Sequence, residues 1–467
     1  MGVLLKSNRV ALAAPVLALV LLLSACSFIP TYERPPAPVA ATFPDAAAAP
    51  GAGTPTADLP WAEFITDARL RLLVDSALKN NRDLRIATLN VEQVRAQLGL
   101  ARADLLPSVG AGLAASSTPG AAGNVRSISA GLTVSSFELD LFGRVKSLSE
   151  AAAARYLASD EGRRAAQVAL VAGVANAELA LRADDELLRI TERTLASREE
   201  ALKLVRVRFD GGVSAEPELR SADSLLAAAR ANVLALRRQR AQDLNALVLL
   251  LGQGVPTDLP AAAPLAASAL PAVPVGLPSD VLLQRPDIRQ AEQQLIAANA
   301  NIGAARAAFF PRITLTGSAG VASSSLSSLF DNTVYSFTGQ LLQPIFDAGR
   351  NRANLDAAKS GREIAVAQYE KAIQSAFREV ADALAGRATL GEQLAAQQAQ
   401  ADAETRRLEL AELLFQGGTA SALDRLDAER SALAARQAVV QLQLAQQQNA
   451  VLLYRVLGGG AGAAATR

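Results

Sequence analysis

Few side chains of this 467-residue sequence are of the types that catalyse reactions or hold metal ions. Histidine is absent and Cys26 is the only cysteine. Imidazole and thiolate groups supply most metal ligands and most hydrolytic bases and nucleophiles, so metal sites built on His or Cys and Ser-His-Asp or Cys-His catalysis are excluded. The formal net charge of +1 offers no general attraction for nucleic acid. We therefore expect no enzyme, no metal and no bound cofactor.

Cys26 belongs to an export signal. Lys6 and Arg9 precede an apolar run over residues 10–23, which matches the core of a signal peptide and is short for a membrane-spanning helix. The run leads into Leu-Ser-Ala-Cys ending at Cys26, which resembles the lipobox cut by the lipoprotein signal peptidase. A lone cysteine in an exported protein has no disulfide partner. We expect residues 1–25 to be removed and Cys26 to carry N-acyl and S-diacylglycerol lipid; an ordinary signal peptide with an incidental cysteine is the alternative.

The residue after Cys26 indicates the destination. Ser27 stands where lipoproteins of the inner membrane usually carry an aspartate, so the predicted location is the outer membrane. No later apolar stretch approaches about 18 uninterrupted residues, the length of a membrane-spanning helix. The protein must therefore sit on the membrane by its lipid alone or enter it as strands.

The chain is internally duplicated. Three motifs recur 206 residues later: Gly-Arg at 143 and 349, Phe-x-Gly-Gly at 209 and 415, and Leu-Gly at 251 and 457. Upstream, Asp-x-Arg at 83 and 287 and an apolar residue before Pro107 and Pro311 recur at a separation of 204. Self-similarity of this kind indicates a repeated structural unit. The two-residue slip lies between the proline and the Gly-Arg motif, where we expect a loop.

Each copy begins and ends with helices. Residues 65–105 and 285–309 have apolar side chains at helical spacing, and Pro107 and Pro311 end these runs. In the first run the apolar face comprises Leu70, Leu73, Val74, Ala77 and Leu78. After each Gly-Arg motif, long helical runs go out and return, over residues 143–208, 215–251, 349–414 and 420–457. About 65 residues at a rise of 1.5 Å would reach on the order of 100 Å, which favours a coiled-coil-like assembly.

Between these helices the sequence predicts strands. Apolar residues alternate with Ser, Thr, Gly and Gln, which is the two-residue period of a strand. Each copy therefore predicts a β-hairpin, over residues 107–137 and 311–342, with Ser-, Gly- and Asn-rich loops at 116–125 and 322–333. Each strand has about the ~10 residues that cross a bilayer at a tilt. A soluble α+β protein with two hairpins packed on helices is the alternative.

The expected organisation follows from these signals. It comprises a signal peptide (1–25), a lipidated extended segment (26–60), a first repeat (61–252), a Pro/Ala-rich connector (253–284), a second repeat (285–458) and a flexible tail (459–467). Four strands do not close a barrel, and an open sheet edge in lipid leaves backbone groups unsatisfied at several kcal/mol each. Three copies supply twelve strands, which would form a β-barrel with a water-filled lumen.

Specific motifs carry a resemblance to a known family. They are YERP at 32–35, ELDLFGR at 138–144, LPSD at 277–280, RPDIR at 285–289, AANANIGAA at 297–305, FFP at 309–311 and PIFDAGR at 344–350. The match that they carry covers nearly the whole mature chain. The sequence resembles the TolC-like outer-membrane factors, in the OprM/NodT branch of lipoproteins that serve efflux pumps of the resistance-nodulation-division (RND) type.

The resemblance implies a fold and partners. It implies a mostly α-helical, duplicated chain that forms a homotrimer, with a twelve-stranded β-barrel in the outer membrane and a periplasmic α-helical barrel. It also implies a periplasmic adaptor, an inner-membrane RND pump, and passive conduction of drugs and other small amphiphiles. The same architecture used for type I protein secretion or metal-ion export is one alternative. A non-transporting structural coiled-coil lipoprotein is another.

By the same resemblance, the periplasmic tip closes near the motif LDRLDA at 423–428. Asp424 and Asp427 would face the lumen as rings of three carboxylates each, which repel one another and bind cations. Aspartates in the first turns of a helix also favour the helix dipole without any gate. Arg425 stands where the family usually has an apolar residue, and it would neutralise part of the ring or form a latch with it.

Two further sets of residues could be taken for sites. Gly211-Gly212 and Gly417-Gly418 match no phosphate-binding pattern and are expected to be helix C-caps; by resemblance an adaptor touches these turns. The carboxylates of Glu138 and Asp140 lie at a strand-to-helix junction, where we expect a structural role.

Overall fold

The computed structural model describes residues 27–44, 59–120, 123–267, 270–271 and 279–460. The expected signal peptide 1–25, Cys26 and most of the expected tail lie outside these residues. The chain divides into two compact units. The strand unit comprises the chain up to Ala37, Thr88–Gly162 and Arg289–Ala372. The helical unit comprises Pro38–Ala87, Arg163–Ile288 and the chain from Ile373.

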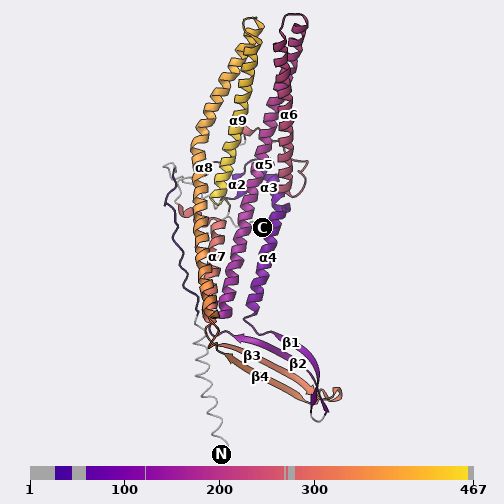
Figure 1. Cartoon of the computed structure of the whole chain (residues 1–467), viewed down its shortest axis with the longest axis vertical. Helices are drawn as coiled ribbons and strands as arrows, with labels where there is room; N and C mark the ends of the chain where they lie inside the picture. The colour runs from indigo at the N-terminus through magenta and orange to yellow at the C-terminus, as the bar shows by residue number, and fades with distance from the viewer. Residues whose placement is uncertain (1–26, 45–58, 121–122, 268–269, 272–278, 461–467) are drawn as a thin grey trace, which may run out of the picture. The chain divides into compact units, whose positions relative to one another are not determined.

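The strand unit contains one four-stranded antiparallel sheet. Its strands lie side by side in the order β1 (Val109–Gly120), β2 (Gly123–Leu139), β3 (Arg312–Ser323) and β4 (Thr333–Leu342) (Figure 1). The hairpins β1–β2 and β3–β4 come from the first and second sequence repeats, and the ladder between β2 and β3 joins the repeats. Within the described residues, β1 and β4 have a partner on one side only.

The two faces of this sheet differ in polarity, as the alternation predicts. Directly opposite residues share a face, so the register places Val109 with Val134 and Ala111 with Leu132 on the apolar face. The pairing of β2 with β3 shifts between Val134 and Phe137, where Ser135 and Ser136 stand opposite the single residue Thr316. This β-bulge carries Ser136 at a φ of 52°, and the Ser136 amide donates to the Thr316 hydroxyl at 3.2 Å.

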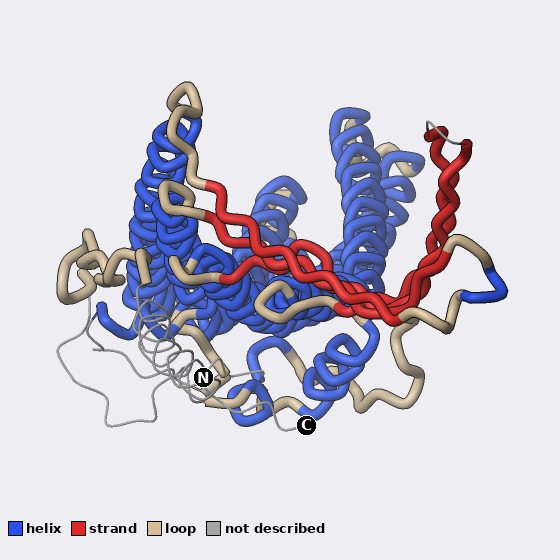
Figure 2. Tube along the Cα trace, turned by 90° about the horizontal axis from the view of Figure 1, so that it is seen from below, coloured by secondary structure: helices blue, strands red, loops and turns tan. Residues whose placement is uncertain are grey.

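The first hairpin is longer than the sequence predicts. Residues 116–125 were expected to form a loop because they are rich in Ser, Gly and Asn, but Ser116 pairs with Ser127 and the ladder continues to Gly120 opposite Gly123. Figure 2 shows β1 and β2 continuing together past the ends of β3 and β4. The second hairpin does have a long connection, residues 324–332, which contains the short helix η4 (Leu326–Ser328). The slip between the copies therefore coincides with different hairpin lengths.

The first helical run is divided into several helices. The run contains α3 (Ala68–Asn80) and α4 (Arg82–Ala103), and the short helix α2 (Trp61–Phe64) precedes it. The break is at Asn81, whose side-chain oxygen accepts from the amide of Leu84 at 2.8 Å and so begins α4. On α3, Leu70, Leu73, Val74 and Ala77 are buried, as their spacing predicts, whereas Leu78 is half-buried.

The long helices follow the predicted runs closely. They are α5 (Arg144–Asp210), α6 (Glu216–Leu251), α8 (Arg350–Gln416) and α9 (Ala422–Val456), and α5 and α8 have 67 residues each. The second repeat begins with η3 (Ser279–Gln284) and α7 (Pro286–Ala307), and the connector contains η2 (Leu265–Ala267). Many of the buried positions on the long helices are alanines, which let neighbouring helices approach closely. None of the described helices combines the length and the apolarity needed to cross a membrane.

Equivalent residues of the two repeats make equivalent contacts in the helical unit. The Asn81 side chain donates to the carbonyl of Leu250 at 2.9 Å, and the Arg285 guanidinium donates to the carbonyl of Val456 at 2.9 Å. Asn81 corresponds to Arg285, and Leu250 to Val456, at the separations of 204 and 206 found in the sequence. In each repeat, the residue before the helix that leads into the hairpin (α4 or α7) therefore binds the C-terminal end of the last long helix (α6 or α9).

Candidate functional site

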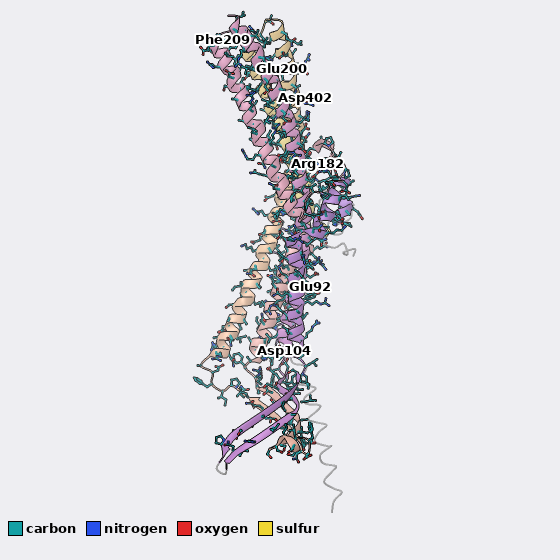
Figure 3. The ribbon with its side chains drawn as sticks, turned by 90° about the vertical axis from the view of Figure 1, so that its right-hand side faces the viewer. Glu92, Asp104, Arg182, Glu200, Phe209 and Asp402 are labelled. Atoms are coloured by element: carbon teal, nitrogen blue, oxygen red, sulfur yellow. The ribbon has the colours of Figure 1, made fainter. Side chains whose placement is uncertain are left out.

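The two Gly-Gly motifs end the long outgoing helices. Gly212 and Gly418 have a φ of 73° each, in the left-handed region that glycine adopts without strain. The amide of Gly212 donates to the carbonyl of Phe209, and the next amide, of Val213, donates to the carbonyl of Arg208. Phe209 is labelled in Figure 3. Gly418 and Thr419 repeat this pattern on α8. Both turns are Schellman caps, which confirms the predicted C-cap role.

Both turns lie at the same end of the helical unit (Figure 1). Large apolar side chains are exposed there, including Val213 (72%) and Leu423 (70%). Exposed apolar side chains near a rigid turn favour contact with another chain over contact with water. The turns therefore suit a docking tip.

Asp424 begins α9 in a capping box with Ser421. The Ser421 hydroxyl accepts from the Asp424 amide at 3.1 Å, and Asp424 Oδ2 accepts from the Ser421 amide at 3.1 Å and from its hydroxyl at 2.7 Å. These hydrogen bonds from Ser421 lower the pKa of the Asp424 carboxyl, which is fully exposed. In the single chain Asp424 thus has the helix-capping role that the sequence left open, and its charge is available to solvent.

Asp427 lies one turn further along α9 and has two arginine partners. Arg430 donates to Asp427 Oδ1 at 2.6 Å, and Arg407 of α8 approaches Oδ2 at 3.5 Å. These contacts tie α9 to α8 near the tip. Because all three side chains are at least 43% exposed, each pair contributes little to stability.

Arg425 pairs with a glutamate on α8. Its Nη1 donates to Glu412 Oε2 at 3.2 Å, and its guanidinium lies 5.0 Å from the centroid of the Phe415 ring. The Arg425 side chain is 13% exposed, and its Nε is buried without a partner. Arg425 also lines an open pocket of about 740 Å³ among α5, α8 and α9. In the single chain Arg425 of α9 therefore binds α8 through Glu412 and Phe415.

Glu429 connects the two helical hairpins. It lies on α9 one turn beyond Arg425, is buried, and stands 3.8 Å from the guanidinium of Arg198 on α5. Burial raises the pKa of the Glu429 carboxyl, and the charges of Arg198 and Arg425 oppose that rise. Further along, Gln437 of α9 donates to the hydroxyl of Thr191 on α5 at 3.2 Å. Sequence reasoning missed this link because Glu429 and Arg198 come from different repeats and share no motif.

The first repeat lacks the paired aspartates. Glu218 and Ser221 occupy the positions that correspond to Asp424 and Asp427. The N-cap residue of α6 is Ala215, whose side chain makes no capping hydrogen bond. Pro217, in the first turn of α6, supplies a φ that already suits a helix. The capping box and the doubled carboxylate thus belong to α9 alone.

Glu138 and Asp140 do have the expected structural role. Glu138 accepts two hydrogen bonds from Arg144, at 2.8 and 2.7 Å, and pairs with Arg312 of β3 at 2.6 Å. Asp140 accepts from the backbone amides of Arg144 and Lys146 at 2.7 Å each, which caps α5. The pair therefore fixes the junction between β2 and α5.

The segment after Cys26 lies on α7 of the strand unit. Arg34 donates to both oxygens of Glu292, at 2.7 and 3.0 Å, and the hydroxyl of Tyr32 donates to Glu292 Oε1 at 3.0 Å. Nearer the cysteine, the ring of Phe28 stacks on Phe310 with centroids 4.6 Å apart. The YERP motif thus attaches the segment after Cys26 to α7 through Glu292. Nothing in the sequence indicated this role.

Among the described residues, no group of three or more Asp, Glu or Cys side chains is arranged to hold a metal ion. The model of the family described as "Outer membrane efflux protein" matches residues 73–253 and 277–459. These two matches start 204 residues apart and end 206 apart, like the sequence repeats. The chain belongs to the outer membrane efflux protein family.

Individual members of the family support the assignment along the whole chain. The solvent efflux pump outer membrane protein SrpC of Pseudomonas putida is 47% identical, with 96% of this chain and 97% of SrpC covered. The outer membrane protein OprJ of Pseudomonas aeruginosa is 44% identical, with 97% of each chain covered. The structure of the open state of the MtrE outer membrane channel of Neisseria gonorrhoeae is 41% identical, with a TM-score of 0.85 over 93% of this chain and 99% of MtrE.

The family membership confirms the resemblance drawn from the motifs. It also confirms the predicted fold class of a mostly helical, duplicated chain with four strands, and the location in the outer membrane with a periplasmic extension. The outer membrane efflux proteins are channels and not a family of enzymes. The modification of Cys26 and the roles of the tip residues stay predictions.

Proposed function

We propose that this chain is the exit duct of a tripartite efflux system. As a homotrimer it passively conducts drugs and other small amphiphiles to the outside. A periplasmic adaptor and an inner-membrane RND pump deliver these substrates, and the pump supplies the energy. The relatives named for solvent, toluene and antibiotic efflux support this class of cargo.

The observation that carries the proposal is the open sheet of the strand unit. Among the described residues, its edge strands β1 and β4 each lack a partner on one side, and one of its faces exposes large apolar side chains such as Leu113 (74%) and Phe337 (74%). In lipid such edges leave backbone donors and acceptors unpaired at several kcal/mol each. Pairing β4 of one copy with β1 of the next removes every edge, and three copies of four strands then form a closed twelve-stranded wall.

The other face of the sheet suits a water-filled lumen. Thr133, Ser318 and Ser336 stand opposite one another in the register, and the hydroxyls of Ser318 and Ser336 are 2.8 Å apart. A lumen lined by short hydroxyl groups hydrates a passing solute and binds no particular one tightly. This lining fits a passive duct.

We assign adaptor contact to the turns at Gly211-Gly212 and Gly417-Gly418, and the resting gate to Asp424 and Asp427. The Schellman turns and the exposed apolar residues beside them support the first assignment. The solvent-exposed charge of Asp424 supports the second. Arg425 acts through α8, because its carboxylate partner is Glu412. It holds the α8–α9 tip together.

The test combines mass with conductance. The lipidated, full-length protein extracted in mild detergent should have the mass of three protomers and should form discrete single channels in planar bilayers. Expression in a strain that lacks its own efflux duct should restore dye extrusion only when an adaptor and an RND pump are present. A monodisperse monomer with an intact sheet would contradict the proposal. A trimer without conductance would favour the structural lipoprotein.

A further inference from the structure

The apolar face of the sheet has a measurable height. On β2, apolar side chains of this face run in six rows from Leu139 to Ile128, and the bulge keeps Phe137 on the same face as Val134. Alternate residues of a strand are about 6.8 Å apart, so five steps span about 34 Å along the strand. At a tilt of about 40° this corresponds to roughly 26 Å, close to the height of the apolar band of outer-membrane strands.

Arg126 lies in the next row beyond this band. It shares the parity of Ile128 and stands directly opposite Ser117 of β1, on the part of the hairpin that continues past β3 (Figure 2). This is the end of the sheet away from the connections to the helices. A side chain here faces outward at the outer boundary of the lipid.

Arg126 is also the one unpaired charge of the described strands. The other charged residues in these strands, Glu138 and Arg312, bind each other at the opposite end of the sheet. Arg126 is exposed, and within the part of the chain that the structure describes it has neither an ion-pair partner nor a side-chain hydrogen bond. A guanidinium presents a planar fork of donors that matches phosphate oxygens.

We propose that Arg126 binds a phosphate group of lipid A in the outer leaflet. A trimer then carries three such sites around its outer rim, where they fix the height of the duct in the membrane. The inference rests on the proposed function, because the apolar face must be the lipid-facing wall. Arg126 meets lipid because it lies on the apolar face of the sheet. A charge at the same height on the opposite face would meet the aqueous lumen.

The test measures lipid retention on the full-length trimer. Native mass spectrometry in mild detergent, with lipid A as the probe, should show an apparent Kd about fivefold weaker for Arg126→Gln, the effect of one arginine at an anionic membrane surface. Dephosphorylated lipid A should bind both proteins equally weakly. Phosphatidylglycerol should show a smaller difference between the two proteins than lipid A does.

Two second-site variants separate this site from a general effect of charge. In the Arg126→Gln background, Ser117→Arg restores a guanidinium in the same row and on the same face, and should recover lipid A binding. Val125→Arg places the charge on the other face at nearly the same height, and should not. Equal recovery by both variants, or unchanged retention in Arg126→Gln, would overturn the inference.

Conductance distinguishes this inference from the proposed function. Arg126→Gln should conduct like the wild type, because Arg126 lies outside the lumen. If the wild-type protein neither trimerises nor conducts, the proposed function fails and this inference fails with it. If the trimer conducts and lipid A binding ignores Arg126, only the lipid site is wrong.

Discussion

Asp424 combines a capping role with a candidate gating role, and substitutions can separate the two. Asp424→Asn removes the charge but keeps a side-chain oxygen that can accept from Ser421, whereas Ser421→Ala weakens the capping box and keeps the charge. If the charge ring closes the tip, Asp424→Asn should raise the resting conductance and weaken block by multivalent cations. Ser421→Ala should cost the start of α9 about 1 kcal/mol, seen as faster amide exchange, with little change in block.

The matched control for this charge is Glu218, at the corresponding position of the first repeat. Glu218→Gln should leave both the resting conductance and the cation block unchanged. If Asp424→Asn behaves like Glu218→Gln in single-channel recordings, Asp424 is a helix cap and no part of the gate.

A second carboxylate makes stability depend on pH. Asp184 of α5 is buried, and burial together with the nearby carboxylate of Asp243 on α6 raises the pKa of the Asp184 carboxyl to about 7. The folded chain holds this proton more tightly than the unfolded chain. The contribution of Asp184 to stability is therefore present below a pH of about 4 and is lost as the pH rises towards 7.

Asp184→Asn should remove this loss. Relative to wild type, the variant should be more stable by roughly 1–3 kcal/mol at pH 8 and nearly unchanged at pH 4, because asparagine does not ionise. Thermal unfolding followed by circular dichroism at both pH values measures the difference. Asp185→Asn is the control, since its neighbour Asp185 is exposed and already bound to Arg240. A stabilisation that is equal at both pH values would rule out titration of Asp184.

At the residue scale the sequence predicted the roles that depend on local backbone. The C-caps at Gly212 and Gly418 follow from the need for a left-handed residue after a helix. The capping box also had a signal, because Ser421 and Asp424 have the spacing of that motif. The pairing of Arg425 with Glu412 had none, since it depends on how α8 and α9 are rotated about their axes.

The elements themselves were predictable where a period continues without interruption. The long helices keep one apolar stripe with no proline in α5, α8 and α9, and their predicted ends agree with the structure to within a few residues. Residues 116–125 were wrongly assigned to a loop because composition indicates a turn, whereas cross-strand pairing extends the hairpin to Gly120. The last residues of β2 were missed because the bulge interrupts their alternation.

One glycine pair sets how closely β2 and β3 approach. Gly131 and Gly320 stand opposite each other, a Cβ added to Gly131 would lie 2.5 Å from the carbonyl oxygen of Ala319, and one added to Gly320 would overlap the carbonyl of Ala130. Gly320→Ala should therefore lower the stability of the assembled protein by roughly 1–3 kcal/mol. The temperature at which the detergent-extracted assembly dissociates measures this effect.

Gly317→Ala in the same strand is the comparison. A Cβ there would meet its nearest neighbour, the carbonyl oxygen of Ser336, at 3.7 Å, an ordinary contact. This variant should dissociate at nearly the wild-type temperature. Equal loss in both variants would mean that glycine matters in β3 for its flexibility and not for close approach.

At the scale of the whole molecule, the repeats of the sequence are not the units of packing. The strand unit and the helical unit each take segments from both repeats. In the strand unit the ladder of β2 with β3 crosses from one repeat to the other. In the helical unit the ring of Phe64 stacks on Tyr454 of the second repeat, with centroids 4.1 Å apart. Each compact unit is therefore built by both repeats together, and neither repeat forms a unit of its own.

Because each compact unit needs segments of both repeats, we expect that neither repeat folds alone. Residues 61–252 and 285–458, produced separately, should each lack a protease-resistant core, because each would expose half of both cores. Produced together from one cell, the two pieces should recover resistance to limited proteolysis. A folded, protease-resistant single repeat would show that the contacts between the repeats are dispensable.

The need for partner strands follows from the sequence more directly than the contacts near the tip do. Four alternating strands with two free edges require partners on general physical grounds, whatever the family. The contacts near the tip involve a few side chains such as Arg425 and Glu429, whose partners lie on other helices. Local patterns therefore predict the strands better than the side-chain contacts near the tip.

Ser135 and Ser136, which stand opposite Thr316 in the bulge, determine which face of the sheet the last residues of β2 occupy. On the apolar face of β2, Phe137 and Leu139 after the bulge are odd-numbered, whereas the residues of that face before the bulge, from Ile128 to Val134, are even-numbered. Deleting either serine would rotate the lower strand by half a period, sending Phe137 towards water and the carboxylate of Glu138 into hydrocarbon. Substitutions at Ser135 and Ser136 should be tolerated far better than single-residue deletions. A substitution keeps two residues opposite Thr316, and it is this number that determines which face the following residues occupy.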